Sequence, residues 1–256
     1  MKCAQKPCTV SPAAPPQLSQ TDPPLVCLRE QVQKRLSALG LKELYLPHLT
    51  LTKPSGPHVP ILLPDPSVLR TRKRIVVLIN DSMHNDLGIL AYRLLAREPG
   101  LNGGSVINFA KELASRSPST CNLGAQTKLS KDGAGIEHVE HAPGLVVLNT
   151  AQLLYSHKFN NTLSFRSWNC LPRPSRSHGS VQMHAENEVP GHGSPEEHVR
   201  SVFETVVLRP EYVAADAEIY IVAIEKGFRH LLDALKRDCK CPIYRPPSSP
   251  LSPVFE

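Results

Sequence analysis

Apolar runs alternate with amphipathic stretches along the middle of the chain. The uninterrupted apolar runs, which are typical of parallel strands covered on both faces, lie at residues 75–79, 145–148 and 219–224. Apolar residues at helical spacing predict helices at residues 87–95, 105–116, 194–207 and 228–235. Right-handed crossovers would make the three strands parallel and adjacent, so the pattern predicts an α/β fold with a mainly parallel sheet and helices on both faces.

The segment before the first parallel strand has a different pattern. Residues 25–40 predict a helix that ends at Gly40, and residues 44–51 and 59–63 predict two short strands around a proline-rich turn. We expect these strands to form an antiparallel edge. Three helix starts are also marked, by Asp86 and Ser105 as N-caps and by Ser194 with Glu197 as a capping box.

Composition divides the chain into a domain and two tails. Its 256 residues suffice for one α/β domain, and many of its 25 prolines cluster in residues 11–24 and 242–253. We therefore expect a disordered N-terminal tail over residues 1–24, one domain over 25–240 with a polar insertion at 117–143, and a proline-rich tail over 241–256.

The sequence shows no apolar segment of the kind that spans a membrane or directs secretion. No stretch approaches the roughly 18 apolar residues that span a bilayer, and Met1 to Gln20 has no apolar signal region. Seven scattered cysteines favour thiols in a reducing compartment. We expect a soluble intracellular protein of the nucleus, the cytoplasm or both. A net charge of +6 permits acidic partners without identifying one.

The most informative corner follows the last strand. Ala223 and Gly227 have the small-x-x-x-small spacing of the nucleophile elbow, the strained strand-to-helix turn of α/β-hydrolases. Glu225 stands where the nucleophilic serine would be. The pattern thus predicts an α/β-hydrolase-like domain without the usual nucleophile.

Three longer motifs point to one family. Residues 75–93 (IVVLINDSMHNDLGILAYR), 144–154 (GLVVLNTAQLL) and 194–198 (SPEEH) resemble the fungal Argonaute-binding protein two domain, and the resemblance covers Leu36 to Arg237. It implies an α/β-hydrolase-like domain that serves in RNA silencing and heterochromatin. Relatives include a subunit of the Argonaute siRNA chaperone complex, a domain at the C-terminus of a fungal histone deacetylase and an animal co-transcriptional regulator.

The resemblance also sets expectations about the end of the domain. Some relatives keep a serine at the elbow, where this chain has Glu225, and the family's domain continues past the elbow helix with further strands. Here a proline-rich stretch follows Cys241. We expect a domain truncated after the elbow helix, from an alternative product or a mis-joined gene model.

Glu225 has three interpretations: a carboxylate nucleophile, a ligand-binding carboxylate, or a polar residue tolerated at an exposed turn beside Lys226 or Arg229. We favour the third. The loop after the first parallel strand faces the same expected crevice and offers two catalytic candidates, Ser82 and His84. We favour a structural loop there, in which Asp81 and Asp86 cap turns and a helix, because two residues so close on a loop have no fixed mutual geometry. The full predicted crevice comprises Asn80, Asp81, Ser82, Met83, His84, Asn85, Glu225 and Lys226.

Two further clusters invite binding hypotheses. His178, His184, His192 and His198 lie close in sequence but lack metalloprotease spacing, so we interpret them as solvated loop residues and expect neither metal nor cofactor. A basic patch with one aromatic residue could stack a base and contact phosphates of small RNA, or could be a partly packed lid. Its residues are Arg166, Trp168, Arg173 and Arg176.

These observations favour a non-catalytic interaction module in small-RNA-directed heterochromatin silencing. On the resemblance, its partner is Argonaute or a histone-deacetylase complex. The alternatives are an α/β-hydrolase acting on an ester or epoxide, and an siRNA-binding subunit.

Overall fold

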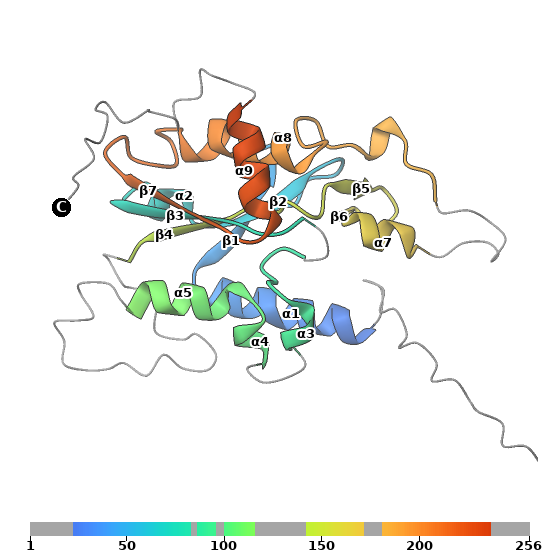
Figure 1. The fold of residues 1–256 in the computed structure, drawn as a ribbon, viewed down its shortest axis with the longest axis horizontal. Coiled ribbons are helices and arrows are strands. Elements are labelled where there is room, and N and C mark those ends of the chain that lie inside the picture. The colour runs from blue at the N-terminus through green and yellow to red at the C-terminus, as the bar shows by residue number, and fades with distance from the viewer. Residues whose placement is uncertain (1–22, 83–85, 96–99, 116–141, 172–180, 237–256) are drawn as a thin grey trace, which may run out of the picture.

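A five-stranded sheet in the order β1-β2-β4-β3-β7 forms the centre of the fold (Figure 1). The computed structural model describes residues 23–82, 86–95, 100–115, 142–171 and 181–236. The strands are β1 (Leu41–Leu46), β2 (Val59–Pro64), β3 (Arg74–Ile79), β4 (Gly144–Val147) and β7 (Glu218–Ala223). Strands β4, β3 and β7 run parallel, whereas β1 and β4 pair antiparallel with β2.

Helices cover both faces of this sheet (Figure 1). One side carries α1 (Pro23–Ala38), α3 (Tyr92–Leu95), α4 (Gly100–Gly103) and α5 (Val106–Ser115). The other side carries α8 (Pro195–Val202), which continues as the π-helix η2 (Phe203–Val207), and α9 (Lys226–Lys236). A short helix, α2 (Pro66–Leu69), connects β2 to β3. The mixed α/β architecture agrees with the sequence pattern.

The alternation of side chains along β3 builds two cores. Ile75, Val77 and Ile79 pack into the cluster under α8 and α9, while Val76 and Leu78 pack into the cluster against α1 and α5. Every apolar residue of β3 is buried, as expected for a strand covered on both faces. The adjacency of the three parallel strands and the antiparallel β1–β2 edge are both confirmed.

The helix predicted over residues 87–95 is wrong for most of its length. Only α3 is helical there, and Gly88 adopts φ 79°, which interrupts a right-handed helix. Leu90 and Ala91 instead donate their N–H groups to the Gly104 carbonyl. Asp86 is no N-cap: its buried carboxylate accepts hydrogen bonds from Arg29 of α1 at 2.7 Å and from the Tyr92 hydroxyl.

Two helix starts agree with their predicted caps. Ser105 accepts from the N–H of Ile107 at the start of α5, and Ser194 accepts from the N–H of Glu197 at the start of α8. The capping box at α8 is only half formed, because the Glu197 carboxylate reaches the N–H of Gly193.

The region after β4 contains several short elements. A second sheet pairs β5 (Leu154–Ser156) with β6 (Asn161–Leu163), followed by α7 (Phe165–Asn169) and the 3-10 helix η1 (Ala185–Asn187). Tyr155 and Val189 are buried there against Val59 of β2. The expected tails, the insertion and residues 83–85 fall largely outside the described residues.

Candidate functional site

The elbow after β7 has the geometry that its sequence predicted. Glu225 adopts φ 50°, a left-handed conformation that is strained for any residue with a Cβ. Gly227 approaches β3 so closely that a Cβ there would lie 2.3 Å from the Ile79 carbonyl oxygen. The lack of a side chain at Gly227 thus lets α9 begin against the carboxyl end of β3.

Glu225 itself points to no chemistry. The residue is exposed. The exposure agrees with the interpretation of Glu225 as a polar residue at an exposed turn. Arg229, one of the two residues expected beside Glu225, has its ion pair with Asp233, at 3.7 Å. Lys226, the neighbouring crevice residue, is also exposed.

The loop after β3 is polar but well packed. Asn80 and Asp81 are buried. The side-chain amide of Asn80 donates to the Ile89 carbonyl, and the main-chain carbonyl of Asn80 accepts from the Thr150 hydroxyl after β4. Met83, His84 and Asn85 lie outside the described residues, so the place of His84 among the catalytic candidates stays a prediction.

Ser82 meets a different histidine. Its hydroxyl lies 2.8 Å from Nε2 of His230 on α9, and Nδ1 of the same ring lies 2.8 Å from a carboxylate oxygen of Glu196 on α8. The sequence pattern indicates Ser82 as a candidate but neither of its two partners. One signal was available: His230 occupies the buried stripe of α9, which otherwise contains Gly227, Leu231 and Ala234.

The protonation state of this group follows from its contacts. Burial acts to raise the pKa of the Glu196 carboxyl, but its own backbone N–H, the His230 ring and the Ser194 hydroxyl outweigh burial and hold that pKa below the usual value. An ionised carboxylate only accepts, so His230 carries its proton on Nδ1. In the neutral ring Nε2 is then free to accept from the Ser82 hydroxyl.

The histidine cluster divides into separate environments. His192 and His198 are fully buried, with their Nδ1 atoms 2.9 Å apart, so their interpretation as solvated loop residues is wrong. His184 is exposed, and His178 lies outside the described residues. Within the described part of the chain, no three His, Cys, Asp or Glu side chains are grouped to hold a metal ion.

Trp168, the aromatic residue of the predicted RNA patch, is buried. Trp168 is 3% exposed and donates its indole N–H to the Val181 carbonyl, so its face is unavailable to a base. This burial agrees with the alternative of a packed segment. Arg166 is exposed, whereas Arg173 and Arg176 lie outside the described residues.

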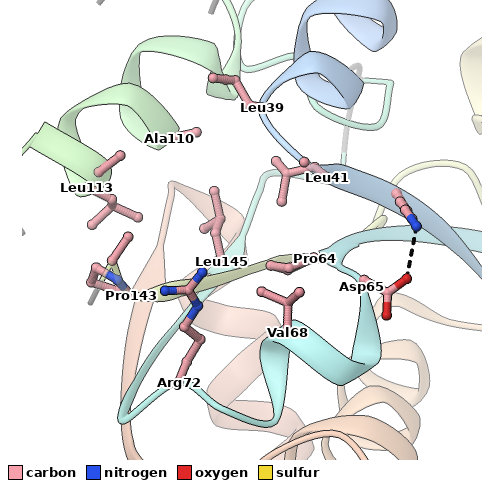
Figure 2. Close-up of a pocket in the computed structure, with 14 residues that line it drawn as sticks. Leu39, Leu41, Pro64, Asp65, Val68, Arg72, Ala110, Leu113, Pro143 and Leu145 are labelled. Atoms are coloured by element: carbon pink, nitrogen blue, oxygen red, sulfur yellow. Dashed lines mark hydrogen bonds and ion pairs between the residues drawn. The ribbon is translucent and has the colours of Figure 1, made fainter. Parts of the chain in front are cut away.

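A cleft of about 240 Å³ lies at the opposite end of the sheet (Figure 2). Leu41, Val68 and Leu145 line it, and the Arg72 side chain extends toward Leu145. The Lys42–Asp65 ion pair, at 2.9 Å, closes one side. Since the parallel strands begin at this end, the cleft is remote from the crevice that open α/β sheets use for ligands.

Together the fold and the polar loop after β3 define an α/β protein with an elbow and a serine–histidine–glutamate contact where parallel strands end. The Arb2 domain model matches residues 24–241, so the chain belongs to the Arb2 domain family, that of Argonaute-binding protein 2. This confirms the resemblance seen in the sequence. No curated protein and no solved structure gives a match. Among the described helices, none has the length and apolar character needed to cross a membrane.

Proposed function

We propose that this chain is a protein-interaction module of an Argonaute-associated complex in small-RNA-directed heterochromatin silencing. The observation that carries the proposal is the family match, which extends across nearly the whole described part of the chain. Argonaute is the partner favoured here, and a histone-deacetylase complex is the alternative. A silencing role would place the protein in the nucleus for at least part of its working life.

We also propose that the domain is of the α/β-hydrolase type. Three features support this: the parallel trio β4-β3-β7, the elbow after β7, and a loop after β3 that lies beside the elbow helix. The elbow carries Glu225 in place of a serine, so the interaction role does not depend on elbow chemistry.

Exposed apolar side chains give the interaction role a surface. Tyr220 on β7 is 51% exposed and Phe228 on α9 is 57% exposed, with Ile219 and Leu232 also exposed on the same two elements. Within the described residues β7 is an edge strand, with one side unpaired. Exposed apolar groups beside an open strand edge are typical of protein contact sites. Ile221 packs into the core under α9 and Val222 into the core on the other face, so Tyr220 lies on the face opposite α9. We assign the open edge of β7, with the apolar groups on both of its sides, to the Argonaute partner.

The test is affinity capture of the tagged full chain from its own cells. Tyr220→Ser and Phe228→Ser should each reduce the Argonaute recovered, measured by quantitative mass spectrometry. Phe165→Ser is the matched control, because Phe165 is 62% exposed but lies on α7. Absence of Argonaute from the wild-type capture would contradict the proposal. Equal loss in all three variants would contradict the assigned surface.

A further inference from the structure

One hydrogen-bonded chain crosses three segments that are distant in sequence. The Ser82 hydroxyl contacts Nε2 of His230, and Nδ1 of His230 contacts Glu196, each at 2.8 Å. Both distances lie within the range that links a nucleophile to its base and the base to its orienting acid. The proposed interaction role uses none of these residues.

We propose that Ser82, His230 and Glu196 form a nucleophile–base–acid triad that hydrolyses carboxylic esters. A triad is recognised by geometry and roles rather than by its place in the chain. Here Ser82 follows β3 and His230 lies on α9, the helix after the elbow. The proposed catalytic centre therefore lies beside the elbow, with its nucleophile on the loop after β3. Glu225, although it occupies the elbow, takes no part.

The contacts assign each group its role. Glu196 has a pKa below its usual value and accepts from Nδ1–H, which fixes the tautomer and the ring orientation of His230. Nε2 then presents a lone pair to the Ser82 O–H. This is the arrangement in which a neutral imidazole removes the hydroxyl proton as the oxygen attacks.

The three side chains are positioned by rigid elements. His230 is 8% exposed and lies one turn into α9, whose start is fixed against Ile79 by the close approach of Gly227. Glu196 lies in the first turn of α8, where Ser194 caps the helix and the helix dipole favours a negative charge. Ser82 is half-buried, and its hydroxyl is held by the contact with His230.

The reaction balances without any further reactant than water. Ser82 Oγ bonds to the acyl carbon while its proton passes to His230 Nε2, and the tetrahedral intermediate then expels the alcohol, which takes that proton. Water then attacks the acyl carbon of the acyl-serine and gives a proton to Nε2. The bond between the acyl carbon and Ser82 Oγ breaks, and Oγ takes the proton back from Nε2. One ester and one water become one carboxylic acid and one alcohol, and Glu196 stays ionised throughout.

The test uses the purified full chain with a fluorophosphonate probe and with p-nitrophenyl acetate. The probe should phosphonylate Ser82 with loss of fluoride, and peptide mass spectrometry should locate the label there. Ser82→Ala should abolish labelling, and His230→Gln should lower kcat/KM for the acetate about 10²–10⁴-fold. Glu196→Gln should lower kcat more than it raises KM, because it weakens the base rather than substrate binding.

Two further variants separate catalysis from a structural contact. Ser67→Ala removes an exposed serine bonded to the Asp65 carboxylate and should leave labelling and turnover unchanged. Ser82→Cys keeps a hydrogen-bonding group in place, so it controls for loss of folding. This variant should lose fluorophosphonate labelling. Its new thiol should react with iodoacetamide faster than the thiol of Cys27, which is exposed. A wild-type chain that is neither labelled nor active, or a label at any other residue, overturns the proposal while leaving Argonaute capture untouched.

Discussion

Gly227 and the carbonyl of Ile79 are in such close approach that no side chain fits between them. A Cβ on Gly227 would lie 2.3 Å from that oxygen and 3.1 Å from the Asn80 carbonyl oxygen. The contact joins the start of α9 to the end of β3. It also brings His230, one turn along α9, within hydrogen-bond reach of Ser82 on the loop that leaves β3.

Gly227→Ala should therefore destabilise the domain by about 1–3 kcal/mol, the usual cost of overpacking. The backbone of β3 cannot yield without disturbing the parallel pairing on both of its sides. Urea unfolding followed by circular dichroism measures the change. Lys226→Ala, at the exposed neighbouring position, is the control and should change stability by less than about 0.5 kcal/mol.

Glu225→Gly should have the opposite sign. The left-handed backbone at φ 50° costs a residue with a Cβ about 1–2 kcal/mol, and glycine relieves that cost while losing some unfolded-state entropy. We expect a net gain of about 1 kcal/mol in the free energy of unfolding. Arg229→Gly, inside the same helix at an exposed site, should instead lose about 1 kcal/mol. If both glycines destabilise alike, the strain at the elbow is refuted.

Local signals identified most of the fold, and long-range contacts account for what they missed. The apolar run of β3, the Ser194 cap and the spacing of Ala223 and Gly227 each act within a few residues, so the sequence displays them. Asp86 was misinterpreted because its partner Arg29 comes from another helix. Ser82 and His230 are 148 residues apart, and only the adjacency of β3 and β7 brings them together.

The Arg29–Asp86 ion pair should contribute more to stability than its charge alone suggests. The Asp86 side chain is 1% exposed and the Arg29 side chain 22%, so Arg29→Met would remove from a buried carboxylate the countercharge that lies 2.7 Å away. Breaking such a pair from one side costs about 3–5 kcal/mol. We expect a loss of that size in chemical unfolding.

Lys42→Met provides the matched comparison. Its ion pair with Asp65 has a similar length, 2.9 Å, but the two side chains are 52% and 35% exposed. Exposed pairs contribute about 0–1 kcal/mol. Equal losses in Arg29→Met and Lys42→Met would show that burial does not set the strength of the Arg29 contact.

The buried histidine pair should make the domain sensitive to mild acid. Nε2 of His198 accepts from the Asn149 N–H at 3.2 Å, so its proton lies on Nδ1 and is donated to Nδ1 of His192. A second proton on either ring would break one of these hydrogen bonds. Burial lowers the pKa of His192 to about 4. The pKa of His198 is lowered well below its usual value, mainly by burial and to a smaller extent by the nearby His192.

The direction of the pH effect follows from these lowered pKa values. Between the unfolded pKa of 6.5 and the folded pKa of about 4, the unfolded chain binds more protons, so stability is full above pH 6.5 and is lost as the pH falls. By pH 5, His192 alone should cost about 2 kcal/mol. Urea unfolding at pH 7, 6 and 5 measures this loss. His192→Leu should be less stable at pH 7 yet lose less between pH 7 and 5. The remaining slope comes from His198, whose pKa burial still lowers, and from other groups such as buried His58. His48→Gln, at an exposed site, should leave the slope unchanged, and an unchanged slope in His192→Leu would exclude His192 as one of its sources.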